Sequence, residues 1–196
     1  VLAACQTTPA VPTPIGPVTR QDLVTLINWE RSPLAVVFRA EATTTDTTSF
    51  ASRSEIADCT VYGDNRVVFT APDGIAKSIA WQLVSDEAIR LFVEDLTLNY
   101  QIYNQRAGLD TLDADLRPDQ TETLTLVVNG QAHRADALGG WPADYYQSVT
   151  ERCRSVADAP AELLPFGAYV SVEVVPYDGN MPSTDWSAAN GIDLAA

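Results

Sequence analysis

Two turn sequences, each flanked by β-prone runs, constrain the fold of this chain most strongly. One is Gly63-Asp64-Asn65, between the runs 60–62 and 66–69, and the other is Asn129-Gly130, between 123–128 and 131–137. Gly, Asn and Asp tolerate the positive φ angles that tight hairpin turns require. Each sequence therefore predicts a β-hairpin, and two hairpins predict an antiparallel sheet.

Apolar residues at helical spacing predict helices that could cover such a sheet. Ser85 can cap a helix whose apolar stripe recurs at i, i+3, i+4 and i+7. The stripe consists of Ile89, Phe92, Val93 and Leu96. A second helix is expected after Pro142, with Tyr145, Tyr146, Val149, Cys153 and Val156 on its buried face. A short third helix is expected over 20–29, after the capping residue Thr19.

Three further segments have strand-like patterns. They are 35–40, 77–84 and 169–175. In 77–84 the residues Ile79, Trp81 and Leu83 share one face, so Trp81 is expected in the core. Hairpins with helices between them predict an α+β fold, in which an antiparallel sheet built from hairpins packs against one or two helices.

The N-terminus carries a sequence typical of export. Leu2-Ala3-Ala4-Cys5 resembles the lipobox of bacterial lipoproteins, in which the signal peptide is cut before the Cys and the Cys sulfur receives a diacylglycerol. The resemblance implies that Cys5 is a lipidation site, with several acyl chains as a lasting anchor. The alternative is an ordinary stretch of small residues that contains a cysteine.

The residues after Cys5 suit a spacer. Segment 6–18 holds four prolines and no charge, which favours an extended, semi-stiff chain that cannot complete a ladder of hydrogen bonds. We therefore expect four parts in the sequence. They are a residual signal peptide over 1–4, a lipid-anchored Pro/Thr-rich tether over 5–18, one α+β domain over 19–175 and a C-terminal tail over 176–196, whose natural end can lie beyond Ala196.

The other two cysteines form an even pair once Cys5 is assigned to lipid. In an oxidising compartment such a pair usually forms a disulfide, so we expect a bond between Cys59 and Cys153. In the chain-entropy model, closing a loop of roughly 95 residues stabilises the fold by about 3–5 kcal/mol. The alternative is two separate buried thiols.

A wider resemblance rests on the first hairpin. The sequence Thr60-Val61-Tyr62-Gly63-Asp64-Asn65-Arg66-Val67-Val68, a capped helix and the segment 119–128 are similar to an uncharacterised group of bacterial lipoproteins. In that group a YGDGR-type hairpin precedes a helix and a further strand. Asn65 stands where the group usually has Gly, which the turn can accept. The resemblance implies no activity, because the function of the group is unknown.

Charge and hydropathy argue against several partners. The net charge is −14, with 26 acidic and 12 basic residues. Such a surface repels the phosphate backbone of nucleic acids and the headgroups of anionic lipids, so no nucleic acid is expected as a partner. The sequence contains no run of 18 apolar residues that would predict a membrane-spanning helix.

Few residues form a recognisable site. Asp110, Asp113 and Asp115, with Asp119 and Glu122, make an acidic cluster on an expected loop and are candidate calcium ligands, although the pattern lacks the glycine and terminal glutamate of an EF-hand. The alternative is a solvated acidic loop.

His133 is the only histidine. The sequence contains no G-x-S-x-G nucleophile motif that could pair with it, so it is expected on the surface of a strand. Trp141, between Gly140 and Pro142, is a candidate sugar-stacking residue.

These observations favour an envelope lipoprotein domain that binds or scaffolds an envelope protein or glycan, without enzymatic activity, catalytic residues or a cofactor. A rival is a carboxylate-based cell-envelope hydrolase, which could depend on calcium and would need two converging carboxylates in a concave pocket. A third reading is a module resembling a proteinase inhibitor, which would present a rigid exposed loop. We expect the domain to face the periplasm or the exterior, held to the membrane through Cys5.

Overall fold

The computed structural model of the chain describes residues 26–44, 56–71, 78–113 and 116–164. The strands are β1 (Val36–Thr44), β2 (Cys59–Tyr62), β3 (Arg66–Ala71), β4 (Ser78–Leu83), β5 (Gln120–Val128), β6 (Gln131–Asp136) and β7 (Ala161–Glu162). The α-helices are α3 (Asp86–Leu98) and α4 (Tyr145–Arg154). Short 3-10 helices are η1 (Ile102–Asn104), η2 (Leu109–Thr111) and η4 (Ala137–Gly139). The predicted α+β class is confirmed.

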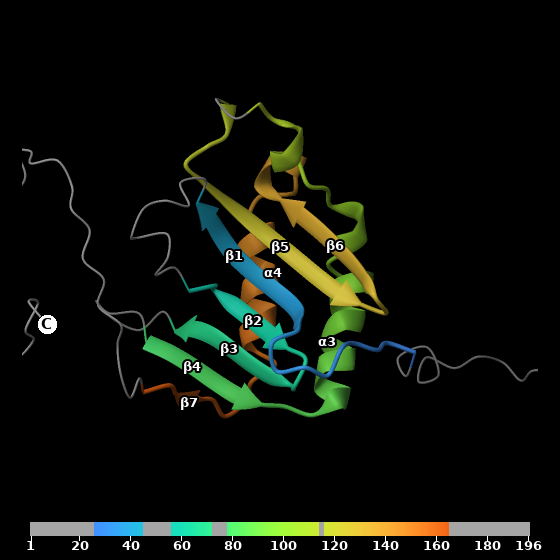
Figure 1. Cartoon of the computed structure of the whole chain (residues 1–196), viewed down its shortest axis with the longest axis vertical. Helices are drawn as coiled ribbons and strands as arrows, with labels where there is room; N and C mark the ends of the chain where they lie inside the picture. The colour runs from blue at the N-terminus through green and yellow to red at the C-terminus, as the bar shows by residue number, and fades with distance from the viewer. Residues whose placement is uncertain (1–25, 45–55, 72–77, 114–115, 165–196) are drawn as a thin grey trace, which may run out of the picture. The chain divides into compact units, whose positions relative to one another are not determined.

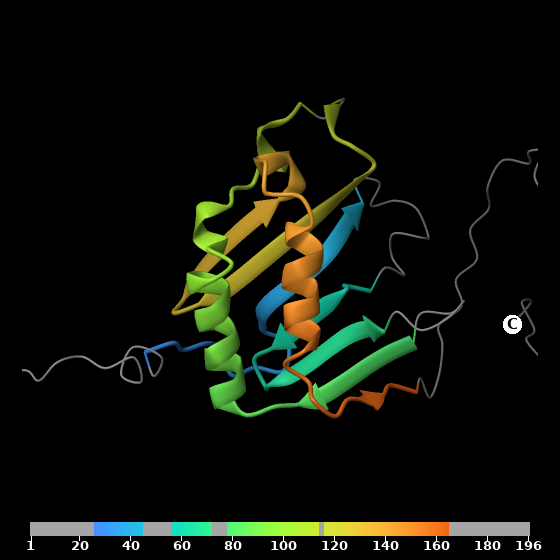
Figure 2. The ribbon, with the colours of Figure 1, turned by 180° about the vertical axis from the view of Figure 1, so that it is seen from behind.

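The strands form one sheet in the order β6-β5-β1-β2-β3-β4-β7, and all neighbouring pairs are antiparallel. Figure 1 shows the sheet with both helices behind it, and Figure 2 shows the same two helices in front. The described residues thus form two layers, with α3 and α4 on one face of the sheet. No helix among them covers the opposite face, which we call the helix-free face.

Both predicted hairpins are present. The β2–β3 turn places Asn65 at φ 71°, and the β5–β6 turn places Asn129 at φ 53° and Gly130 at φ 70°. The side-chain amide of Asn65 also donates to the Val84 carbonyl and to Asp86. A glycine would tolerate the positive φ equally well but could not make these hydrogen bonds. Long β1 joins the two hairpins, because it pairs with β2 on one side and with β5 on the other.

The core lies between the sheet and the helices. Phe38 of β1 and Phe92 of α3 are both fully buried, and their rings meet edge to face at 5.1 Å. Helix α3 begins as predicted, since the Ser85 hydroxyl accepts a hydrogen bond from the Ala88 N–H. Its predicted stripe is buried, as is the predicted face of α4 apart from Val156, which is only partly buried.

The helix expected over 20–29 is wrong for residues 27–29, which are not helical; residues 20–25 lie outside the described part. The backbone of this segment bonds elsewhere. Asn28 exchanges hydrogen bonds with Asn129 in the β5–β6 turn, and the Ile27 carbonyl accepts from Arg90 on α3. These partners satisfy backbone groups that a helix would have satisfied internally, so tertiary contacts override the local apolar spacing.

The predicted strand over 77–84 is confirmed as β4, but its inward face is wrong. Ala80 is buried on the helix side, beside Phe69 of β3. Trp81 is only half-buried, opposite Val68 on the helix-free face, and Leu83 is 59% exposed. The strand predicted over 35–40 also ends later than expected, because β1 continues to Thr44 opposite Gln120. The strand expected over 169–175 lies outside the described residues.

No helix in the described segments has the length and apolar character needed to cross a bilayer. The N-terminal sequence 1–25, which includes Cys5 and the predicted tether, lies outside them.

Candidate functional site

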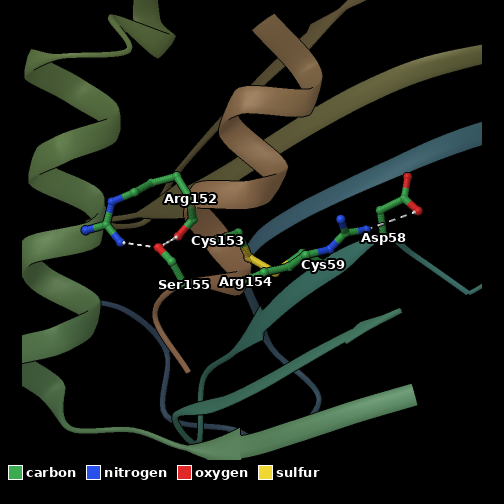
Figure 3. The surroundings of a disulfide bond; sticks show 6 residues. All are labelled: Asp58, Cys59, Arg152, Cys153, Arg154 and Ser155. Atoms are coloured by element: carbon green, nitrogen blue, oxygen red, sulfur yellow. Dashed lines mark hydrogen bonds and ion pairs between the residues drawn. A yellow bond between two sulfur atoms is a disulfide. The ribbon is translucent and has the colours of Figure 1, made fainter. Parts of the chain in front are cut away.

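A disulfide fixes helix α4 on the sheet. Figure 3 shows the bond between Cys59 of β2 and Cys153 of α4. Their Cα atoms are 6.3 Å apart, and the two residues are 94 positions apart in the sequence. Both cysteines are fully buried, and Arg154 lies 4.0 Å from Asp58 beside the bond. The predicted pair is therefore confirmed, and it sets the position of the helix whose first turn carries two aromatic residues.

Those aromatic residues, Tyr145 and Tyr146, are held through their hydroxyl groups. Tyr145 donates to the Tyr100 carbonyl at 2.9 Å, and Tyr146 donates to the Asp58 carboxylate at 2.6 Å. Burial raises the pKa of Tyr145 to about 12 and raises the pKa of Tyr146 further, with the Asp58 hydrogen bond also raising it. Both hydroxyls therefore stay protonated at neutral pH and act as donors, so the two rings have fixed positions.

The loop before α4 brings Trp141 against these rings. A Cβ on Gly139 would lie 1.9 Å from the Arg106 carbonyl oxygen, so only glycine fits there. Asp136 is fully buried, and its carboxylate accepts hydrogen bonds from four backbone N–H groups. These belong to Gly108, Leu109, Leu138 and Gly139. The Asp136 carboxylate thus joins the backbone just before Trp141 to the 108–109 segment and fixes the position of the loop that carries Trp141.

Trp141 is half-buried and packs on both tyrosines. Its ring lies 5.6 Å from Tyr145 and 6.2 Å from Tyr146, nearly parallel to the second at 25°. Its indole N–H has no hydrogen-bond partner among the described residues. In contrast, the N–H of Trp29 donates to the Gly63 carbonyl at 3.2 Å. The indole N–H of Trp141 is therefore free to donate a hydrogen bond to a ligand, as the polar groups of aromatic residues in ligand sites commonly do.

Trp141 lines an open depression of about 330 Å³ at the N-terminal end of α4. In Figure 2 this end of the helix is the upper one. The lining residues are Glu122, Ala137, Trp141, Pro142, Ala143, Asp144, Tyr145, Tyr146 and Gln147. We call it the aromatic depression. Its volume falls at the lower end of the range for small-molecule sites, roughly 300–1,000 Å³.

The charged groups of the aromatic depression are both acidic. Glu122 is exposed, but the protein removes part of the water around its carboxylate, which raises its pKa, and the nearby negative charge of Asp58 raises the pKa further. Asp144 has φ 60°, and its side chain makes no capping hydrogen bond to α4. A non-glycine residue in the left-handed region costs free energy, and such residues cluster at ligand sites. The depression therefore combines a flat apolar ring with two carboxylates at its rim.

The predicted calcium ligands are only partly described. Asp115 and the side chain of Asp110 lie outside the described residues, and Asp113 is exposed on the loop. Glu122, which we expected in the same acidic loop, lies in β5 instead, because β5 begins at Gln120. Among the residues that the structure describes, no three acidic, histidine or cysteine side chains lie close enough to hold a metal ion.

His133 lies in β6, as predicted, and is partly buried. Its Nε2 atom is 2.9 Å from the Ile102 carbonyl, and its ring is 5.1 Å from that of Tyr103. No cysteine nucleophile is available to it from the described residues, since Cys59 and Cys153 are joined to each other. The histidine is therefore best explained by its contact with the η1 turn.

Two smaller depressions lie elsewhere among the described residues. One, of about 270 Å³, is on the helix-free face, where Arg39 and Glu41 lie 3.9 Å apart. The other, of about 230 Å³, lies between α3 and α4, where Arg152 forms an ion pair with Asp95. In both, the charged side chains already have opposite charges as neighbours. Only the aromatic depression combines aromatic rings with carboxylates that no described cation neutralises.

Sequence reasoning found Trp141 but not the residues around it. Glu122 was assigned to the acidic loop because the strand was expected to begin at Thr123. With β5 beginning at Gln120, the alternation of the strand places Glu122 on the same face as Leu124. Tyr146 was predicted to be buried, yet the hydrogen bond to Asp58 that fixes its ring joins residues 88 positions apart. Only the fold could bring those two residues together.

These features define a two-layer α+β domain with an acid-rimmed aromatic depression at the start of its second helix. No protein-family model, no curated protein and no solved structure matches the chain.

Proposed function

We propose that this chain is an envelope lipoprotein whose domain binds a glycan in the aromatic depression without transforming it. The observation that carries the proposal is the environment of Trp141. Its ring is held in place by Tyr145 and Tyr146, and its N–H has no partner in the described part of the chain. Beside it lie two carboxylates, Glu122 and Asp144.

The chemistry of a sugar suits these groups. A pyranose ring has one face made mainly of C–H bonds, which packs on an aromatic ring, and an edge of hydroxyl groups, which donate to carboxylates. Preformed sites cost less to bind, because their side chains are already ordered. The tyrosine hydrogen bonds, the Asp136 contacts and the disulfide keep the depression ordered before any ligand arrives.

Binding is tested by titrating the soluble chain with neutral and amine-bearing oligosaccharides and following tryptophan fluorescence and heat. The Trp141→Ala variant is expected to bind at least about tenfold more weakly, a loss typical of a central aromatic contact. Trp81→Ala is the matched control, because Trp81 is half-buried on the helix-free face, away from the depression. An unchanged affinity in Trp141→Ala, or no saturable binding by any oligosaccharide, would contradict the proposal.

The anchor is tested separately. In a bacterial host that expresses the gene with its full leader, radiolabelled palmitate is expected in the wild-type protein and absent from a Cys5→Ser variant. The Cys5→Ser variant is also expected to leave the membrane fraction. Unlabelled wild-type protein would remove the anchor from the proposal and leave glycan binding untouched.

One observation favours a second function, glycoside hydrolysis. Glu122 has a raised pKa and lines the depression with Asp144, and glycosidases use a pair of carboxyl groups of which one has a raised pKa. Against it, Glu122 is exposed, and general acids are usually desolvated. Incubation of the protein with any oligosaccharide that it binds distinguishes the two functions. Intact recovery supports a binding module, and hydrolysis that Glu122→Gln abolishes would establish the enzyme.

A further inference from the structure

The aromatic rings of this domain differ in how they are paired with cations. Arginine guanidinium groups lie over the rings of Trp29, Tyr62 and Phe92, at 4.0, 5.0 and 5.8 Å from their centres. A positive charge over an aromatic face is attracted by the ring quadrupole. Among the described residues no such cation lies over Trp141, although its ring is half-buried and so more accessible than the buried rings of Trp29 and Phe92.

The carboxylates near Trp141 lack a cation as well. No described arginine pairs with Glu122 or with Asp144, and no basic residue lines the aromatic depression. Arg154 lies 4.0 Å from Asp58, which also accepts from Tyr146, and so its charge is already paired with a carboxylate that does not line the depression. The depression therefore presents an unneutralised negative field together with an unoccupied aromatic ring.

Glu122 responds to this field. Partial desolvation and the charge of Asp58 both raise its pKa, because both disfavour the ionised form. A positive charge bound in the depression would stabilise the ionised carboxylate and would lower its pKa. Because the chain as a whole carries a net charge of −14, it would also attract a cationic ligand over longer range.

From this geometry we propose that the aromatic depression selects a sugar that carries a free, protonated amine. The inference rests on the proposed glycan-binding function and names the ligand class. The sugar's C–H face packs on Trp141, and its ammonium group lies against Glu122 and Asp144. An acidic sugar is repelled by the same carboxylates. A neutral or N-acetylated sugar gains the stacking contact and the hydroxyl hydrogen bonds, but no attraction between opposite charges.

The test compares two matched probes, tri-glucosamine and its fully N-acetylated form, by calorimetry with the whole soluble chain. The pH is set where the amines are protonated and Glu122 is ionised. Tri-glucosamine is expected to bind at least about tenfold more tightly than the acetylated probe. The preference is expected to shrink as the salt concentration rises, since ions screen exposed charges.

Three variants assign the preference to the site. Glu122→Gln and Asp144→Asn each remove a charge but keep an oxygen that accepts from sugar hydroxyl groups. Each is therefore expected to reduce the preference severalfold, because the binding of tri-glucosamine weakens more than the binding of the acetylated probe. Asparagine adopts the left-handed backbone of residue 144 readily, so that variant should keep the loop conformation. Asp113→Asn is the control, because it removes one exposed charge outside the depression. Thermal unfolding followed by circular dichroism checks that each variant is folded.

The outcomes separate the two proposals. Equal binding of both probes, lost in Trp141→Ala, would overturn the amine preference and leave glycan binding in place. Binding of neither probe or any other oligosaccharide would overturn glycan binding itself. A preference that falls equally in Asp113→Asn and Glu122→Gln would assign it to the overall charge and overturn the inference. Equal or tighter binding of a lysine oligopeptide, dependent on Trp141, would identify a protein amine and overturn the sugar class.

Discussion

Asp136 is the residue on which the loops around the depression depend most. Its fully buried carboxylate accepts from four backbone N–H groups in the 108–109 and 138–139 segments. In Asp136→Ala those groups lose their acceptor inside the protein, and each buried unsatisfied group costs about 1–3 kcal/mol. We expect the free energy of unfolding to fall by about 3 kcal/mol or more, measured by urea denaturation, and glycan binding to fall with it.

Two comparisons make this test specific. Asp136→Asn keeps one acceptor oxygen and should lose less stability than the alanine variant. Asp113→Asn removes an exposed carboxylate and should stay within about 0.5 kcal/mol of the wild type. If Asp136→Ala were as stable as the wild type, water would have to replace the carboxylate, and the account of a rigid loop would fail.

Asp86 makes the stability of the domain depend on acid. The Arg31 guanidinium pairs with it through two hydrogen bonds of 2.7 and 2.8 Å, and with Asn65 it lowers the pKa of Asp86 to about 2. The folded-state pKa is lower than that of the unfolded chain, so the stabilisation is fully present above about pH 4 and is lost as the pH falls towards about 2. Both side chains are more than 40% exposed, so the effect is small.

NMR titration of the side-chain carboxyl groups measures this directly. In Arg31→Ala the pKa of Asp86 is expected to rise towards its ordinary value, because the largest cause of its depression is gone. The difference in stability between wild type and Asp86→Asn is expected to vanish at the acid end of the range. A pKa of Asp86 that does not move in Arg31→Ala would show that the ion pair does not persist in solution.

At the scale of elements, the disulfide controls how α4 sits on the sheet. A double Cys59→Ala, Cys153→Ala variant removes a cross-link over 94 residues, and loss of such a bond typically costs about 2–5 kcal/mol. We expect a fall in the melting temperature of about 10 °C for a domain of this size. Scanning calorimetry of wild type, double variant and reduced wild type checks it, with the last two expected to agree.

Binding in the same double variant tells whether the bond also orders the site. The first turn of α4 carries Tyr145 and Tyr146, while Cys153 lies two turns later, so a looser helix should weaken glycan binding even below the melting temperature. Unchanged affinity at low temperature would mean that the tyrosine hydrogen bonds alone hold the rings. In that case the disulfide would serve stability only.

Elements with a strong local cause could be predicted, and those decided by distant partners could not. Ser85 and the spacing of Ile89, Phe92, Val93 and Leu96 predicted α3, and the Asn-Gly turn predicted the β5–β6 hairpin. Residues 27–29 have apolar spacing too, but their backbone bonds to Asn129 and Arg90. The face of Trp81 was wrong because alternation sets which residues share a face, while only the packing of helices sets which face is inward.

At the scale of the whole molecule, the fold class could be predicted from the hairpins and the apolar stripes of the helices. The residues of the site could be brought together only once the fold was known. Trp141 could be nominated from its Gly and Pro neighbours. Its neighbours come from β5 and α4, and Asp58, which fixes Tyr146, comes just before β2. No local pattern connects these segments. Long-range contacts of this kind are decided by topology, and topology is what a single sequence specifies least directly.

Net charge leads to a prediction about membranes. With −14 charges, the soluble chain without an acylated Cys5 is expected to stay in the supernatant when anionic vesicles are sedimented, even at low salt. Vesicles of cationic lipid should pull it down, and added salt should release it. Sedimentation with the anionic vesicles would reveal a basic or apolar surface strong enough to overcome the charge.

The cysteine pair also sets an order of events during biosynthesis. Cys59 leaves the ribosome early, and its partner follows only after β3 to β6 and most of α4 have been made. Until then a single thiol on a nascent strand is exposed to any oxidant or stray thiol that it meets. A cell that makes this protein therefore has to keep Cys59 reduced, or correct wrong bonds, until α4 has been made.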